Sequence, residues 1–427
     1  MAADSGGVSG GVSGGVTLYR YRWAVLAAFM FINLTIQVLW ICFAPISGVA
    51  AEFYGVSELR VGLLAMLFMI VFIPLSLPAS WAIDTFGFRK SVGFGAVLLA
   101  VFGLLRGFYA GSFPVVLVMT IGIAAAQPFL LNAFTKVAAV WFAYEERATA
   151  VGLATVASFA GIIVGEVLTP VLVDRYGIGR MQLIYGAAAA ISAVVFLAVA
   201  REKPPTPAGP AGHEERALVL DGLRQMFKER AFYYIAVAFL VAGGIFNGLS
   251  TWVEGIARPK GLSPAQAGNL AGLMLVGAIV GAVILPLISD RMKRRKPVLL
   301  LGLVLAVPSL AVLTFATSYA VELAAFFAVG LFMIGIAPVL YQYGAEITHP
   351  APEGTSNGMF VLAMQVSVVF IYGMGWLDGR LGSFTPSLMV LIAMLAATCL
   401  LFVGLKDVPA RDTEVPVVVA DAPASAG

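Results

Sequence analysis

Five side chains that could hold a ligand interrupt otherwise apolar stretches of this sequence: Trp40, Gln127, Glu166, Asn247 and Gln365. An indole face attracts cations, an amide donates and accepts hydrogen bonds, and a carboxylate balances a positive charge or carries a proton. Such groups are costly inside a membrane and tend to mark ligand or ion pathways there. We therefore predict that the five residues line one substrate-binding site.

Each residue also has a purely structural interpretation. An amide in a helix bundle often bonds only to a neighbouring helix, and a tryptophan often serves packing. Glu166 is the most unexpected of the five, because its carboxyl group lies well inside an apolar run. It could attract a cationic substrate, carry a coupling proton, or bond to a neighbouring helix. Asn33 and Gln37 are weaker candidates for the same site.

The composition explains why these few groups stand out. Of the 427 residues, 60% are hydrophobic and only 11% are charged, whereas a soluble domain carries about 25% charged residues. No polar stretch is long enough for an attached catalytic domain. Binding to nucleic acid is also disfavoured, because the net charge is only +3 and the basic residues form short clusters.

Apolar runs long enough to cross a bilayer as helices recur along the whole chain. We place twelve of them, at about 22–50, 60–82, 90–110, 114–138, 147–172, 181–200, 231–256, 265–289, 297–317, 320–343, 355–379 and 385–405. Most of the 26 Lys and Arg residues then fall on the side that holds both termini. This bias predicts an integral protein of the plasma (cell inner) membrane with both termini in the cytoplasm.

The runs divide the chain into two halves. We predict a flexible cytoplasmic tail at 1–21, six helices at 22–200 and six more at 231–406, and a second flexible tail at 407–427. Between the halves, residues 201–230 begin with a proline-rich spacer and continue with a short amphipathic helix at 217–227.

A loop motif occurs once in each half, as DTFGFRK at 84–90 and DRMKRRK at 290–296. In each copy a basic pair lies five and six residues after an acid. Two parallel six-helix halves of this kind are typical of the major facilitator superfamily, whose substrate site lies between them, and 82–90 resembles that superfamily's loop motif. The resemblance implies that Asp84 bonds to a helix N-terminus of the opposite half.

These loops also predict a set of gating residues on the cytoplasmic side. Lys136 and Glu346 lie near the cytoplasmic ends of the fourth and tenth runs, one in each half, and are placed to pair when the inner side closes. The predicted set comprises Asp84, Arg89, Lys136, Arg147, Asp290 and Glu346.

Within that superfamily the chain resembles the feline leukaemia virus subgroup C receptor family, whose members carry choline and ethanolamine and have been linked to haem. The resemblance is carried by FYGV at 53–56, LPASWAIDT at 77–85, AQ at 126–127, VWF at 140–142, TPVLV at 169–173, and EITHP at 346–350 leading to EGTSNG at 353–358. It implies that Trp40 stacks on a quaternary ammonium and that Gln127 and Gln365 line the same pocket. We interpret the chain as a prokaryotic relative of this family.

Two departures limit how far the substrate can be inferred. Asn247, next to Phe246, takes the place of an aromatic cage residue, and Glu166 stands where the family is apolar. We expect a carrier of a small organic cation or amine that works by alternating access as a monomer, without cofactor or metal. The alternatives are an organic anion carrier that uses Lys136 and Arg106, and a membrane receptor. An enzyme is disfavoured, because the only histidines, His213 and His349, lie outside the runs.

Overall fold

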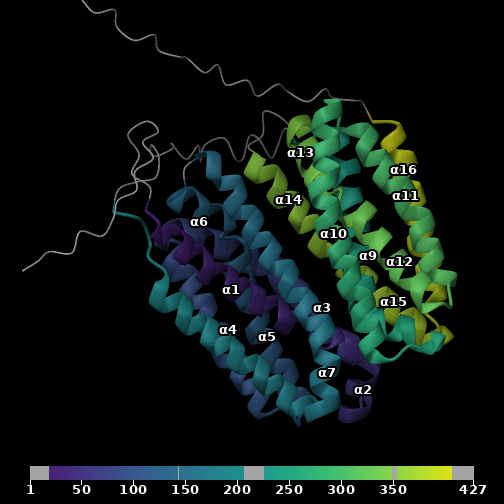
Figure 1. Cartoon of the computed structure of the whole chain (residues 1–427), viewed down its shortest axis with the longest axis horizontal. Helices are drawn as coiled ribbons and strands as arrows, with labels where there is room; N and C mark the ends of the chain where they lie inside the picture. The colour runs from purple at the N-terminus through teal and green to yellow at the C-terminus, as the bar shows by residue number, and fades with distance from the viewer. Residues whose placement is uncertain (1–18, 143, 206–225, 349–352, 406–427) are drawn as a thin grey trace, which may run out of the picture.

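The computed structural model describes residues 19–142, 144–205, 226–348 and 353–405. Every regular element in these ranges is helical, which confirms the predicted all-α class (Figure 1). The predicted amphipathic helix and the two tails fall almost entirely outside the described residues, as do His349 and Pro350.

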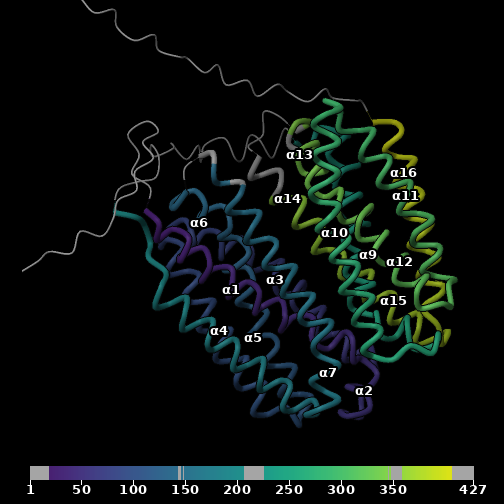
Figure 2. Tube along the Cα trace, viewed as in Figure 1, coloured from purple at the N-terminus to yellow at the C-terminus, as the bar shows by residue number. Residues whose placement is uncertain are grey.

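The helices form two bundles that lie side by side (Figures 1 and 2). The N-bundle contains α1 (Tyr21–Ile41), η1 (Ala44–Ile46), α2 (Ser47–Tyr54), α3 (Glu58–Phe86), α4 (Phe88–Phe108), α5 (Phe113–Leu131), α6 (Phe134–Trp141) and α7 (Tyr144–Val199). The C-bundle contains α9 (Arg230–Ala257), η2 (Arg258–Lys260), α10 (Pro264–Met292), α11 (Lys296–Phe315), α12 (Tyr319–Val329), the π-helical η3 (Gly330–Ile334), α13 (Ala337–Thr348), α14 (Glu353–Val366), α15 (Val368–Leu381) and α16 (Thr385–Val403).

Eleven segments of the described chain are long and apolar enough to cross a membrane. One of them, Thr149–Val199, has 51 residues and would measure about 75 Å as a straight helix, more than twice the roughly 30 Å hydrocarbon core. Gly177 breaks it, with φ 78° and ψ 167°. Divided at Gly177, α7 is long enough for two crossings, and the count of twelve crossings stays a prediction.

Several crossings are interrupted near the middle of the molecule. α5 ends before Asn132, whose amide bonds to Ser76 and Ser80 of α3 at 3.0–3.1 Å, and α14 ends just before Ser367. Broken helices near the midplane free polar groups that can contact a ligand. The breaks therefore lie where a central site is expected.

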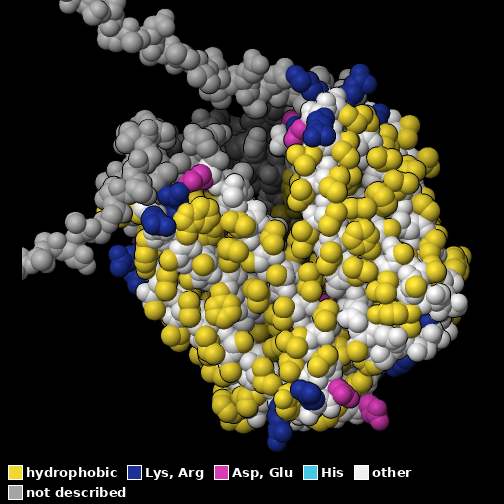
Figure 3. Space-filling model, viewed as in Figure 1, with side chains coloured by type: hydrophobic (Ala, Val, Ile, Leu, Met, Phe, Trp, Pro, Cys, Tyr) yellow, Lys and Arg dark blue, Asp and Glu magenta, His cyan; other side chains and the backbone are white. Residues whose placement is uncertain are grey.

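We call the end where the described chain starts and finishes, near Tyr19 and Leu405, the terminal end, and the opposite one the far end. At the far end the bundles touch closely, since a Cβ atom on Gly268 of α10 would lie 2.1 Å from the Glu166 carbonyl oxygen of α7. Toward the terminal end the surface is hollowed between the bundles (Figure 3). The structure is therefore closed at the far end and open toward the terminal end.

Candidate functional site

A cavity of about 280 Å³ lies between the two bundles. Four of the five predicted binding residues line it: Trp40, Gln127, Asn247 and Gln365. They come from α1, α5, α9 and α14, so both bundles contribute. No charged side chain is among the described residues that line this cavity.

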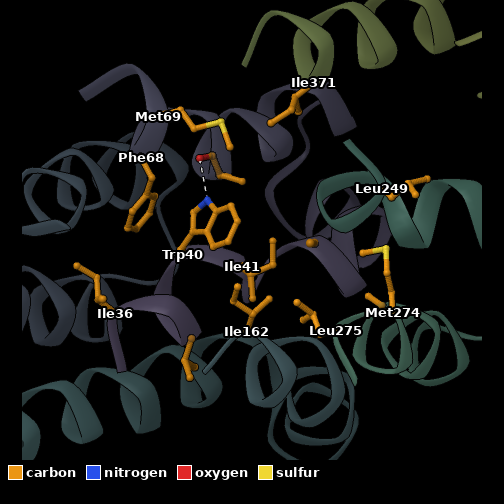
Figure 4. Close-up of a cluster of buried hydrophobic side chains, with 14 of the residues drawn as sticks. Ile36, Trp40, Ile41, Phe68, Met69, Ile162, Leu249, Met274, Leu275 and Ile371 are labelled. Atoms are coloured by element: carbon orange, nitrogen blue, oxygen red, sulfur yellow. Dashed lines mark hydrogen bonds between the residues drawn. The ribbon is translucent and has the colours of Figure 1, made fainter. Parts of the chain in front are cut away.

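One part of the cavity wall is aromatic. Its members are Trp40, Phe68, Phe72, Phe159 and Phe246. The indole nitrogen of Trp40 donates a hydrogen bond to the Ala65 carbonyl at 3.2 Å, which fixes the ring beside Phe68 and Met69 (Figure 4). Phe246 of α9 thus supplies an aromatic ring next to Asn247, the residue that takes the place of an aromatic cage residue in the family. A cation held against such rings gains about 0.5–2 kcal/mol per favourable contact.

The other part of the wall consists of amides, namely Gln37, Gln127, Asn132, Asn247 and Gln365. Gln127 donates to the Gln37 oxygen at 3.3 Å, and Asn247 donates to the Ser367 hydroxyl at 3.1 Å. Gln37, a weaker candidate from sequence, therefore belongs to the cavity. Asn33 instead donates to the Phe29 carbonyl of its own helix.

An apolar layer separates the cavity from the far end. Ile41 and Ile162 of the N-bundle face Leu249, Met274 and Leu275 of the C-bundle (Figure 4), and all five side chains are almost completely buried. Because apolar contacts of this kind exclude water, the layer seals the cavity on that side.

A second, apolar cavity of about 60 Å³ adjoins the first within the C-bundle. Phe246 and Met364 line both cavities. Its remaining lining includes Phe239, Ala242, Met333, Leu340 and Tyr341. Since a methionine side chain is flexible, a ligand in the main cavity could extend an apolar substituent past Met364.

Glu166, the fifth predicted residue, does not line the central cavity. Its side chain is fully buried, and neither carboxylate oxygen has a hydrogen-bond partner among the described residues. The predicted role of a counter-charge inside the substrate pocket therefore lacks the necessary geometry in this conformation. Sequence position gives the depth of Glu166 along its helix but not the face on which it lies.

The far end carries a polar network that sequence reasoning did not single out. One oxygen of Glu254 in α9 accepts hydrogen bonds from the Ser47 hydroxyl at 2.7 Å and the Gly48 amide at 2.6 Å. Arg258 lies 3.4 Å from the other oxygen and pairs with Glu58 of α3 at 2.6 Å. These bonds join the two bundles. The sequence signal that could have identified this network is Glu254 itself, an acid within an apolar run and four residues before Arg258.

The six predicted gating residues all lie near the terminal end, and their described contacts stay within each bundle. Lys136 pairs with Asp84 at 3.3 Å, and Arg295 pairs with both Asp290 and Glu346. Arg147 donates to the Ala139 carbonyl in the last turn of α6 and to the Phe142 carbonyl just after that helix. With the terminal end open, Lys136 and Glu346 have separate partners in this conformation.

Asp84 differs in its contacts from the role that the resemblance implies. Its described partner is Lys136 of its own bundle, and a different acid occupies a helix N-terminus nearby. Glu202 accepts from the backbone amides of Phe88 and Arg89 at 3.0 and 2.8 Å. Gly87 has φ 86°, and a Cβ there would lie 2.1 Å from the Glu202 carboxylate. The glycine of the motif therefore lets Glu202 reach the start of α4.

The two cations of the anion-carrier alternative do not line the cavity. Arg106 is buried and donates to the Leu39 carbonyl and the Thr120 hydroxyl, so it stabilises the end of α1. This arrangement disfavours recognition of an anion in the central cavity by either residue.

Three comparisons with known proteins show what this chain is similar to. The family model described as Major Facilitator Superfamily matches residues 24–371 and 254–425. Solute carrier family 49 member A3 of Danio rerio is 30% identical over 379 residues, which cover 86% of this chain and 80% of that protein. The human protein named choline/ethanolamine transporter FLVCR2 is 28% identical over 390 residues, 86% of this chain and 74% of that one.

Among solved structures, the fold is similar to a bacterial homolog of the human lysosomal transporter Spinster, described as inward-facing and unoccupied. The TM-score is 0.74 at 15% identity, and the match covers 90% of this chain and 96% of the other. At this identity the likeness concerns the fold alone.

Proposed function

Because the chain belongs to the Major Facilitator Superfamily, we propose that it transports a small organic cation or amine, similar to choline or ethanolamine, through the central cavity. The observation that carries this proposal is the lining of that cavity, whose described residues include five aromatic rings and five amides but no charged side chain. Aromatic faces attract cations, and amides bond to a hydroxyl or ammonium group. The similarity to proteins named choline/ethanolamine transporters supports the same substrate class.

In this proposal the two bundles are the moving units of alternating access. Its apolar helices make the chain an integral membrane protein. We place the terminal end in the cytoplasm, because most Lys and Arg residues lie on that side, and the far end outside. The conformation described above would then be the inward-open one. We also propose that the protein works as a monomer in the plasma (cell inner) membrane.

Uptake into proteoliposomes tests the substrate class. Purified protein should accumulate radiolabelled choline or ethanolamine above protein-free vesicles, and unlabelled amines should compete, because cations stack on the aromatic wall. Carboxylates should not compete. Uptake that responds to carboxylates and is indifferent to every amine would contradict the proposal and favour an anion carrier.

The adjoining apolar cavity predicts a preference among amines. Its 60 Å³ offers room for about four water-sized groups, and each buried methylene contributes about 0.8 kcal/mol, roughly fourfold in affinity. Inhibition of uptake by alkyl-trimethylammonium ions should therefore strengthen with chain length up to about butyl and then level off.

Ala242→Phe supplies the matched variant for this series, since it would fill the apolar cavity. We expect it to remove the gain from the longer chains and to leave inhibition by tetramethylammonium unchanged. Equal chain-length dependence in the wild type and in Ala242→Phe would show that the apolar cavity takes no part in binding.

A further inference from the structure

The buried carboxyl group of Glu166 does not line the cavity, but its burial is energetically costly. It lies in the first crossing of α7, and its side chain is 0% exposed. Neither of its oxygens has a hydrogen-bond partner among the described residues. A group of this kind requires a physical explanation.

The surroundings of Glu166 show that it lies at the seam between the bundles. On one side α1 packs tightly on α7, since a Cβ on Gly165 would lie 2.5 Å from Ile41. On the other side α10 of the opposite bundle approaches so closely that a Cβ on Gly268 would lie 2.1 Å from the Glu166 carbonyl oxygen. Glycines at these contacts bring the helices together and exclude water. The seam exists only while the bundles are closed at the far end.

No cation among the described residues neutralises the carboxyl group in this state. The titratable groups nearby are the Cys42 thiol after α1, the Arg106 guanidinium of α4, and the Tyr185 hydroxyl of α7 beyond Gly177. Arg106 donates to Leu39, Thr120 and Cys42, and Tyr185 bonds to Thr169.

The described residues of the opposite bundle provide no partner for the Glu166 carboxyl group either. The stretch of α10 that faces α7 around Gly268 contains only uncharged residues. α9 contributes Glu254 at the far end, which is held by Ser47, Gly48 and Arg258. An ionised Glu166 would therefore be unpaired in the closed seam.

The cost of burial decides which form of Glu166 the closed seam accepts. An unpaired neutral polar group costs about 1–3 kcal/mol on burial by mutational data, whereas an unpaired ion costs several kcal/mol more. We propose that Glu166 is a proton-binding site that must be occupied before the bundles can close at the far end. When they part there, the carboxyl group meets water and releases its proton to that side.

This site differs from a carrier of protons across the membrane. Glu166 does not line the cavity that opens toward the terminal end, so the described structure offers the proton no exit in that direction. The proton therefore sets the balance between conformations according to the pH on the far side. Low pH favours the closed far end, and high pH favours the open one. The inference goes beyond the proposed amine transport and does not depend on it.

A distance measurement across the far end tests the proposal without any substrate. Spin labels at Ser112→Cys and Ser318→Cys, on exposed far-end loops of the two bundles, report whether that end is open, and the native cysteines are both buried. The population with the longer distance should rise as the pH increases from 5.5 to 8, by up to about tenfold per pH unit for one proton. Glu166→Gln should hold the short distance at every pH.

The matched control is Glu52→Gln, which makes the same chemical change at an exposed position of α2 at the far end. It should respond to pH as the wild type does. A wild type that does not respond to pH, or a Glu166→Gln variant that still responds, would overturn the proposal. If Glu166→Gln fails to fold, Glu166→Met is the second neutral variant of similar size, with the same expected result.

A flux measurement separates this site from a coupling site. Vesicles that contain a pH-sensitive dye should show transport whose rate depends on the far-side pH, without proton entry in proportion to solute. Stoichiometric proton entry that Glu166→Gln abolishes would overturn the assignment as a sensor. If no amine is transported at all, the proposed function fails while the distance measurement still decides the role of Glu166.

Discussion

Replacing Trp40 by alanine should weaken the apparent affinity for a quaternary amine by up to about thirtyfold, because a favourable cation–π contact contributes as much as 2 kcal/mol. The ring lines the central cavity, and its nitrogen bond to the Ala65 carbonyl holds it in place. Competition against labelled choline in proteoliposomes gives the affinity. Thermal unfolding of the purified variant checks that the loss does not come from a damaged core, since only 6% of Trp40 is exposed.

Trp40→Phe is the informative companion. It keeps an aromatic face but cannot donate to Ala65, so we expect an intermediate affinity. If Trp40→Ala folds normally and binds amines as tightly as the wild type does, the aromatic wall does not recognise the cation. The proposed substrate class would then lose its main support.

Removing the Glu254 carboxylate should open the far end. Hydrogen bonds to a charged group contribute about 1.5–3 kcal/mol each, and Glu254 accepts two from Ser47 and Gly48 of the opposite bundle. Glu254→Ala should therefore destabilise the closed far end by about 3 kcal/mol, which is more than a hundredfold in population. The spin-label pair at Ser112 and Ser318 measures this shift directly.

Two further variants test how the opening of the far end depends on the charge and on the position of the carboxylate. Glu254→Gln keeps an acceptor oxygen without the charge and should give an intermediate shift, whereas Glu52→Ala at the exposed surface should give none. Label distances in Glu254→Ala that match the wild type would show that the network does not hold the far end closed. The apolar layer of Ile41, Ile162 and Met274 would then be sufficient for closure.

The sequence predicts the fold class well, because helices that cross a membrane must consist largely of apolar residues. Long apolar runs separated by charged loops require helices. The structure confirms the all-helical class, and the matching family model confirms the superfamily. The same composition hides which side of a helix faces the cavity. In a crossing helix the lipid-facing and the interior surfaces are both apolar, so hydrophobic periodicity carries little information.

That limit explains which of the predicted site residues the structure brings together and which it does not. Trp40, Gln127, Asn247 and Gln365 could be selected because polar or indole groups are scarce in apolar runs, and the structure brings them together. Phe68, Phe72 and Phe159 gave no such signal. Glu166 gave a strong one, but its face of the helix could not be read from its position.

The contacts at the terminal end show a second limit on what can be predicted from the sequence. A sequence encodes every conformation of a carrier, whereas the structure presents one of them. Lys136 and Glu346 were predicted as partners in a state with the terminal end closed, and here Lys136 pairs with Asp84 and Glu346 with Arg295. Their pairing across the bundles remains a prediction for the closed state.

The absence of charge among the described cavity-lining residues determines how voltage would act on this carrier. With a cation bound, the moving cavity carries one positive charge, and the membrane potential contributes about 2.3 kcal/mol per 100 mV to its transfer. The empty cavity carries none and returns without electrical work. An inside-negative potential of 100 mV would then favour inward movement of the cation by about fiftyfold, without any coupling ion.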